Sequence, residues 1–252
     1  MNFRTLLILS LSILLSFNSI LAQGKKDDAP SISSALGGLK FRSIGPAFMS
    51  GRIADIAIDP TNENTWYVAV GSGGVWKTTN AGTTWTPLTD NMPFYSTGCI
   101  TIDPNNNASI WLGTGENVGG RHVGIGHGIY HSTDGGKSWK DKGLKKSEHI
   151  SKIIVHPNDP NILWVASQGP LWSAGGERGL YKSSDGGTSW KNTLEVNEWT
   201  GVTDVVIDPT NPKILYAATW QRHRNVAALL GGGPGTSIYK STDGGDSWTK
   251  IN

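Results

Sequence analysis

The chain contains a single cysteine, Cys99, in 252 residues. One cysteine cannot form an internal disulfide, and it cannot build a cysteine-based zinc site. It begins the short apolar run 99–102, a setting typical of a small buried hydrophobic side chain. The sequence therefore excludes disulfides within the chain and a cysteine-ligated zinc ion as sources of stability.

Charged residues are also scarce, at 17%, and the formal net charge is only +2. A nearly balanced, dilute charge distribution gives no basic surface for nucleic acid or for an anionic membrane. We therefore expect no nucleic-acid partner.

Signals for a metal or a cofactor are missing as well. His122 and His127 lie in a glycine-rich loop without an acidic or thiol companion, which is a poor metal spacing. Residues 103–108 begin like a calcium loop but lack its glycine. Residues 71–74 lie within a predicted hairpin rather than before a helix, which excludes a dinucleotide site. We expect neither a metal nor a cofactor.

The one extended apolar run is at the N-terminus. Arg4, the apolar stretch 6–15 and the small residue Ala22 together predict a secretory signal peptide over residues 1–22, cleaved near Ala22. A membrane anchor is the alternative, but serines interrupt the run before the roughly 20 residues needed to span a bilayer. Residues 23–38 read as a flexible lead-in. We expect a protein that is secreted, periplasmic or on the cell surface, and that meets the membrane only through its secretion signal.

Glycine and tryptophan are abundant, with 33 and 11 residues. Much of this excess belongs to one eight-residue pattern that occurs four times, at residues 78–85, 132–139, 183–190 and 241–248. The copies recur roughly every 50 residues, and self-similarity at such a period marks a repeat architecture.

Each repeat predicts four short strands. In the third repeat, Ile153–Pro157 is a β-branched run closed by proline, Leu163–Ala166 and Leu180–Lys182 follow as strands, and the eight-residue box leads into the fourth. No segment shows helical periodicity. This pattern predicts an all-β fold, a β-propeller of four-stranded antiparallel blades. The propeller is expected over residues 39–252, with repeats at about 51–90, 97–142, 150–194 and 202–252.

The residues of the box are interpreted as structural. Its glycines suit a turn with positive φ, its third residue can accept backbone N–H groups, and its tryptophan is large enough to pack on a neighbouring sheet. The third residues are Asn80, Asp134, Asp185 and Asp243, and the tryptophans are Trp85, Trp139, Trp190 and Trp248.

Four blades are few for a propeller, in which each blade must be covered on both faces. We favour a chain that forms part of a larger propeller, with the remaining blades of the parent chain as its partners. The alternative is that Phe41–Ile44 closes a small ring.

The box resembles the Asp-box, or bacterial neuraminidase repeat. Six stretches are similar to large secreted bacterial proteins described as sortilin- or Vps10-like, or as glycosyl hydrolases with such repeats: Phe41–Pro46, Gly73–Thr78, Gly113–Asn117, Ser147–Ile150, Gln168–Trp172 and Tyr216–Arg222. The box is specific for the fold but occurs in proteins of unrelated function, so it says little about chemistry.

In proteins with this resemblance, ligands bind the face opposite the boxes, around the propeller axis. Loops of unequal length are expected there, and binding chemistry accumulates in such loops. They contain aromatic, basic and carboxylate side chains suited to a glycan or polypeptide ligand. The ligand-binding candidates are Glu116, Asn117, Arg121, His122, His127, Trp172, Glu177, Arg178, Trp220, Arg222 and Arg224.

Catalysis can be compared with two related enzyme types. Xyloglucanases carry a catalytic Asp in an Arg-Thr-Asp-Ile-Gly-Gly pattern, and the resemblance puts Gly71 at that position. The equivalent positions of the other repeats are Gly115, Gln168 and Trp220, none of which can transfer a proton.

Sialidases use three arginines, and Arg42 lies in a related but longer motif, with Arg121, Arg178 and Arg222 available to complete a cluster. Glycoside hydrolysis needs two carboxyl groups that flank one bond. Glu116 and Glu177 are the candidate pair.

We expect a secreted Asp-box propeller of sortilin/Vps10-like type that acts as a binding scaffold for polypeptide or glycan. A glycoside hydrolase of sialidase or xyloglucanase type is the first alternative. An assembly-factor propeller that binds a membrane protein complex is the second.

Overall fold

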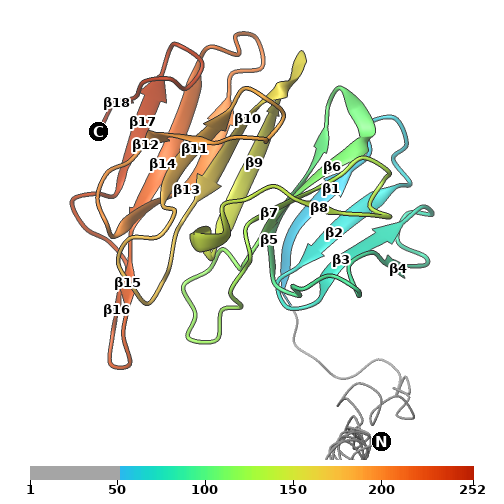
Figure 1. Ribbon diagram of the computed structural model, residues 1–252, viewed down its shortest axis with the longest axis horizontal. Helices are drawn as coiled ribbons and strands as arrows, with labels where there is room; N and C mark the ends of the chain where they lie inside the picture. The colour runs from blue at the N-terminus through green and yellow to red at the C-terminus, as the bar shows by residue number, and fades with distance from the viewer. Residues whose placement is uncertain (1–51) are drawn as a thin grey trace, which may run out of the picture. The chain divides into compact units, whose positions relative to one another are not determined.

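The computed structural model describes residues 52–252, which form four antiparallel sheets of four strands each (Figure 1). The sheets follow one another along the chain and are called blades 1 to 4. Their strands are, in blade 1, β1 (Ile53–Ile58), β2 (Trp66–Val70), β3 (Gly74–Thr78) and β4 (Thr86–Pro87); in blade 2, β5 (Thr97–Asp103), β6 (Asn106–Thr114), β7 (Ile129–Ser132) and β8 (Lys140–Asp141); in blade 3, β9 (Ile150–His156), β10 (Asp159–Ser167), β11 (Gly179–Ser183) and β12 (Lys191–Leu194); and in blade 4, β13 (Thr200–Ile207), β14 (Leu215–Gln221), β17 (Ser237–Ser241) and β18 (Thr249–Lys250).

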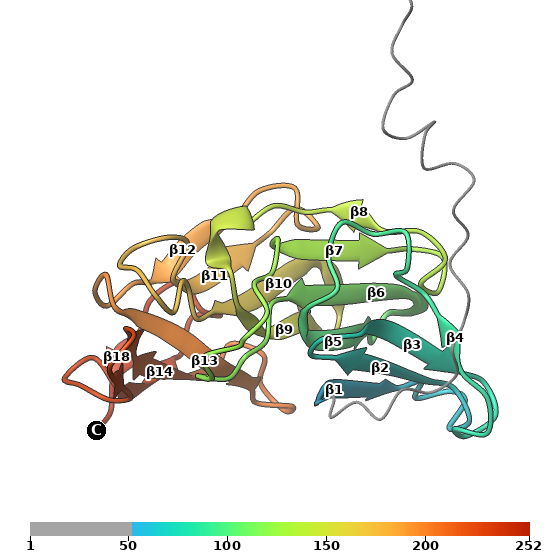
Figure 2. The same ribbon diagram turned by 90° about the horizontal axis from the view of Figure 1, so that it is seen from below.

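The blades are arranged as in a β-propeller, which confirms the predicted fold class. The first strands β1, β5, β9 and β13 contact one another in succession, and the fourth strand of each blade is at the opposite edge of its sheet. Figure 2 shows blades 1 and 4 at the two ends of this row. The predicted leader, the lead-in, Phe41–Ile44 and Arg42 lie outside the described residues.

The predicted turn after the first strand is present in each blade. In blade 1 the Asp59 carboxylate accepts the N–H of Thr61 at 2.9 Å, and in blade 4 Asp208 does the same for Thr210 at 2.8 Å. An aspartate that hydrogen-bonds to the backbone two residues ahead, followed by proline, stops a strand and starts a turn. Local chemistry therefore sets where the first hairpin of the blade turns.

Two elements were not predicted. A hairpin of β15 (His223–Arg224) and β16 (Leu229–Leu230) extends the loop of blade 4, and a 3-10 turn, η1 (Lys145–Ser147), lies between blades 2 and 3. Over residues 52–252, no helix has the length and apolar character needed to cross a membrane.

The box is a hydrogen-bonded hairpin turn. In blade 3, the Ser183 hydroxyl accepts the N–H of Gly187 at 2.9 Å and donates to Asp185 Oδ1 at 2.8 Å. The same carboxylate accepts the N–H of Ser189 at 2.9 Å. The N–H of Gly186 donates to the carbonyl of Asn161, near the start of β10, at 3.0 Å. The box thus closes its own turn and fastens it to the first hairpin of the same blade.

The apolar core lies between blades, and the box tryptophans are part of it. Trp139 packs against the cluster shared by blades 1 and 2, Trp190 against that of blades 2 and 3, and Trp248 against that of blades 3 and 4. The box glycines permit this close packing: a Cβ on Gly187 would meet the ring of Trp111 in the preceding blade. The boxes of blades 2, 3 and 4 therefore each fix their blade to the blade before it.

Trp85, in the first box, lacks this environment. Its side chain is 39% exposed and lines a wholly apolar depression of about 340 Å³ on blade 1, together with Ile53, Ile56, Trp66 and Trp76. No other blade among residues 52–252 covers this surface. Blade 1 thus presents the half of a blade interface that a preceding blade would complete.

The box carboxylates should make the free energy of unfolding depend on pH in the acidic range. Hydrogen bonds from Ser189 and Ser183 hold the pKa of Asp185 well below its usual range. A lowered pKa stabilises the fold above the unfolded value of about 3.9, and this contribution is lost as the pH falls toward the folded value. Asp185→Asn keeps the acceptor oxygen, as Asn80 does in the first box, but removes the titration. In urea unfolding, the stability difference between wild type and Asp185→Asn should narrow from pH 7 to pH 3.

The reciprocal change tests the same argument. Asn80→Asp should add the same kind of acid sensitivity to the first box. A stability difference between wild type and Asp185→Asn that stays constant with pH would contradict the structural role of the carboxylate.

Candidate functional site

The loops opposite the boxes form one connected face, here called the loop face. It consists of residues 115–128, 142–149, 168–178, 195–199 and 222–236, which connect strands at the ends away from the boxes (Figure 1).

Long-range hydrogen bonds join these loops across the blades. Gln168 Nε2 donates to the carbonyl of Asn117 at 3.2 Å, and Arg224 Nε donates to that of Gly119 at 3.0 Å. The loops of blades 3 and 4 are thereby attached to the loop of blade 2.

Glu116 is a buried, fully paired carboxylate. Its Oε1 accepts Nε of Arg52 at 3.1 Å and also forms an ion pair with the same guanidinium, and its Oε2 accepts the N–H of Gly124 at 2.9 Å. Its side chain is 3% exposed. Both oxygens are therefore engaged within the described residues, and the carboxylate organises the loop.

Gly71 makes room for this carboxylate. A Cβ built on Gly71 would collide with Oε1 of Glu116. Gly71 stands where the xyloglucanase resemblance expects a catalytic Asp, and no side chain at that position can supply one. The structure nevertheless brings a carboxylate from blade 2 into the space beside it, which the sequence pattern alone did not reveal.

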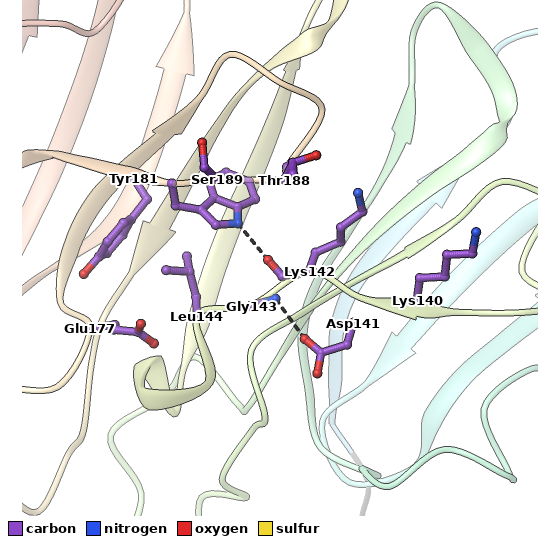
Figure 3. Close-up of a pocket in the computed structure, with 11 residues that line it drawn as sticks. Lys140, Asp141, Lys142, Gly143, Leu144, Glu177, Tyr181, Thr188 and Ser189 are labelled. Carbon is purple, nitrogen blue, oxygen red and sulfur yellow. Dashed lines mark hydrogen bonds between the residues drawn. The ribbon is translucent and has the colours of Figure 1, made fainter.

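Glu177 lies at the edge of the loop face. Its Oε2 accepts the N–H of Lys146 at 2.7 Å, and the side chain lines a groove of about 620 Å³ between blades 2 and 3. Figure 3 shows it near Tyr181 and Leu144 in this groove. Glu116 is instead held by Arg52, next to blade 1. No contact in the described region joins the two carboxylates, so the structure gives no support for them as a catalytic pair.

Arg178 and Arg222 are buried, at 4% and 1% exposure. Arg178 donates to the carbonyls of Gly175 and Gln168, each at 2.8 Å, and to two more carbonyls of its own loop. Arg222 donates to the carbonyls of Val118 at 3.2 Å and Gly169 at 3.3 Å. Burial lowers the pKa of Arg178 to about 10, against the opposing effect of Glu148. Burial, reinforced by Arg178, lowers that of Arg222 to about 9. Both remain charged near neutral pH, and they serve chiefly to bind loops together.

The other polar candidates are dispersed around the blade 2 loop. His122 Nε2 lies 2.8 Å from Nη1 of Arg52, and the side chain of Asn117 donates to the carbonyl of Gly98 at 3.2 Å. Arg121 and His127 are exposed. Within residues 52–252, no group of three or more His, Cys, Asp or Glu side chains could hold a metal ion.

The tryptophans of the loop face have different environments. Trp220 packs under the guanidinium of Arg222, 5.3 Å from its ring centre, and Trp199 lies against His223 with ring centres 4.0 Å apart. Trp172 is 43% exposed, at the tip of a loop whose next residue inward, Leu171, is fully buried. Of these three, Trp172 is the indole most available to a ligand.

One carboxylate that was not among the candidates is less constrained than Glu116 and Glu177. Glu148, between blades 2 and 3, has a φ of 57° and a half-buried side chain. Burial raises the pKa of its carboxyl, while Arg178 and Arg222 oppose that shift. Its neighbour His149 is buried, and burial lowers the pKa of that ring to about 3. The sequence shows both residues to be in a connecting loop, but their burial and backbone conformation depend on packing between blades.

The close approach of Gly71 and Glu116 can be tested by a double-mutant cycle. Gly71→Ala should destabilise the wild type by about 1–3 kcal/mol, because the new methyl group overpacks a filled space. The same change should cost less when Glu116 is alanine, since the colliding carboxylate is then absent. Urea unfolding of the four proteins measures the coupling. Additive effects would show that the two positions do not share this space.

The sequence is similar to curated xyloglucanases. It is 26% identical over 224 residues to xyloglucanase Xgh74A of Acetivibrio thermocellus, covering 78% of this chain and 25% of that protein. It is 25% identical over 229 residues to a xyloglucanase of Hypocrea jecorina, covering 81% and 26%. The chain thus spans about a quarter of the length of these relatives.

Solved structures show the same fold. A crystal structure of an ancestral GH74 enzyme superposes with a TM-score of 0.60 at 24% identity, covering 80% of this chain and 24% of that one. The GH74 enzyme of Niastella koreensis superposes with a TM-score of 0.56 at 23% identity, covering 77% and 28%. The sequence pattern of the Sortilin-Vps10 family, described as sortilin, neurotensin receptor 3, matches residues 127–252, which is half of the chain. The chain belongs to the Sortilin-Vps10 family.

Proposed function

We propose that this chain forms part of the glycan-binding surface of a secreted glycoside hydrolase of xyloglucanase type. The observation that carries the proposal is the exposed indole of Trp172 on the loop face, where Glu116, Arg178 and Arg222 already have partners within the protein. Sugar rings present flat C–H faces, and a large, rigid aromatic surface suits them at little entropic cost.

The sequence relatives support this glycoside-hydrolase alternative better than the polypeptide scaffold. They carry the name xyloglucanase and match about four-fifths of this chain. Family membership is compatible with either function, because a propeller is a scaffold on which different sites are built. The ligand class therefore rests on the relatives and on the aromatic surface together.

The proposal assigns binding, not bond cleavage, to the described residues. A catalytic carboxylate must reach the glycosidic bond, whereas Glu116 has both oxygens engaged and Glu177 has one bound to the Lys146 backbone. The parent enzyme would take its catalytic pair at least partly from sequence beyond this quarter of its relatives' length. Further blades would also cover the apolar surface around Trp85.

Binding can be measured by affinity electrophoresis of the full chain in gels that contain xyloglucan. Trp172→Ala should raise the dissociation constant by about tenfold, because loss of one aromatic contact is worth roughly 1.4 kcal/mol. Trp76→Ala is a matched control, since that indole is 36% exposed but lies on the uncovered surface of blade 1. It should leave the affinity unchanged.

Two outcomes would contradict the proposal. If the wild-type chain is not retarded in a gel that contains xyloglucan at a millimolar concentration of its repeating unit, the proposed ligand class is wrong. An equal loss of affinity in Trp172→Ala and Trp76→Ala would show that the loop face is not the binding surface.

A further inference from the structure

Glu148 occupies a backbone conformation that its side chain disfavours. Its φ of 57° lies in the left-handed region, where residues other than glycine are uncommon, and ψ is −35°. Such conformations persist only where the surrounding structure enforces them, and they cluster at binding and catalytic sites.

Two glycines of the blade 2 loop enforce this conformation. The Glu148 carbonyl accepts the N–H of Gly126 at 2.8 Å, and a Cβ on Gly115 would collide with that same carbonyl. The 3-10 turn η1 ends at Ser147, and Glu148 is its C-terminal capping residue. The chain is therefore bent at Glu148 by packing between blades 2 and 3, against the preference of the residue itself.

The carboxyl group of Glu148 is free to contact a ligand. Among residues 52–252 it makes no hydrogen bond, and no Lys, Arg or His lies within the 4.0 Å of an ion pair. Its side chain is half-buried, so it has neither full hydration nor a protein partner. In this it differs from Glu116 and Glu177.

Polar atoms without protein partners lie in the loops around it. His149 Nδ1, Gln168 Oε1 and Arg222 Nε are all buried and unpaired within the described region. Burial lowers the pKa of His149 to about 3, so its ring is neutral near pH 7, and Nδ1 of a neutral imidazole donates or accepts according to the tautomer. Arg222 Nε is a donor, Gln168 Oε1 is an acceptor and His149 Nδ1 can be either, a set that hydroxyl groups can satisfy because a hydroxyl both donates and accepts.

A small cavity adjoins the same cluster. It has a volume of about 150 Å³ and is lined by Trp199, Arg222, His223 and Leu230, among others. Arg222 thus belongs both to the cavity wall and to the buried cluster. An aromatic wall beside polar groups is a common arrangement in small-ligand sites.

We propose that Glu148 is a ligand-contacting carboxyl group of the loop face, and that its partners are the hydroxyl groups of a glycan. The ligand class rests on the proposed function, whereas the choice of Glu148 rests on its free carboxyl group and its backbone. The strained bend lies within residues 142–149 of the loop face, and the side chain of Glu148 is half-buried there.

Three variants of the full chain test the inference by melting temperature and by xyloglucan retardation. Glu148→Gly relieves the backbone and should raise the melting temperature by about 3 °C while weakening binding at least fivefold. Glu148→Gln keeps the backbone strain and should weaken binding with little change in melting temperature. Glu177→Gln changes a glutamate at the edge of the same face whose carboxylate is bound to the backbone, and it should leave binding unchanged.

The outcomes separate this inference from the proposed function. Wild-type retardation reports on the proposed function, and its absence would overturn that function together with the glycan as ligand. If the wild type binds, equal binding by both Glu148 variants would overturn the inference alone. A lower melting temperature in Glu148→Gly would also overturn it, because it would show that Glu148 is retained for stability.

Discussion

The insertion of one blade's box between its own first hairpin and the preceding blade is the contact on which the rest of the fold depends. The box closes its turn with a hydroxyl and a carboxylate or amide, and it places an indole in the apolar layer between sheets. Because the core lies between blades, no blade buries its apolar surfaces alone. Blade 1 has no preceding blade among the described residues, and its apolar surface around Trp85 is therefore left exposed there.

Because the boxes at one end of the blades hold the fold together, the loops at the opposite ends of the strands can vary in length. The boxes are eight residues long in all four blades, whereas the loops between the second and third strands range from the short turn at 71–73 to the long segment 222–236. These loops hold together by polar contacts, with Arg178, Arg222 and Arg224 donating to backbone carbonyls of their own loop and of its neighbours. Of the four arginines that the sequence suggested as ligand-binding residues, these three therefore already have hydrogen-bond partners within the protein.

The scaffold could be predicted because its signals are local. An Asp-Pro step ends a strand within a few residues, and a box closes a hairpin turn within eight. One copy therefore suffices to predict the turn, and four copies give the repeat length of about 50 residues. The positions of Glu116 and Glu148 could not be predicted in this way. Glu116 enters space left by Gly71 in another blade, and the bend at Glu148 depends on Gly115 and Gly126 in a different loop. Neither relation has a sequence spacing that would reveal it.

The contacts around Glu116 and Glu148 change which glutamate of the loop face is the better ligand-binding candidate. Residue type and loop position made Glu116 and Glu177 equivalent candidates, but a carboxylate whose oxygens are already engaged must break those contacts before it can serve a ligand. Glu148 has no such contacts to break within the described region, and its backbone already bears the strain of its position. The free carboxyl group, rather than the most buried or the most strongly paired one, is therefore the better indication of where a ligand would contact the loop face.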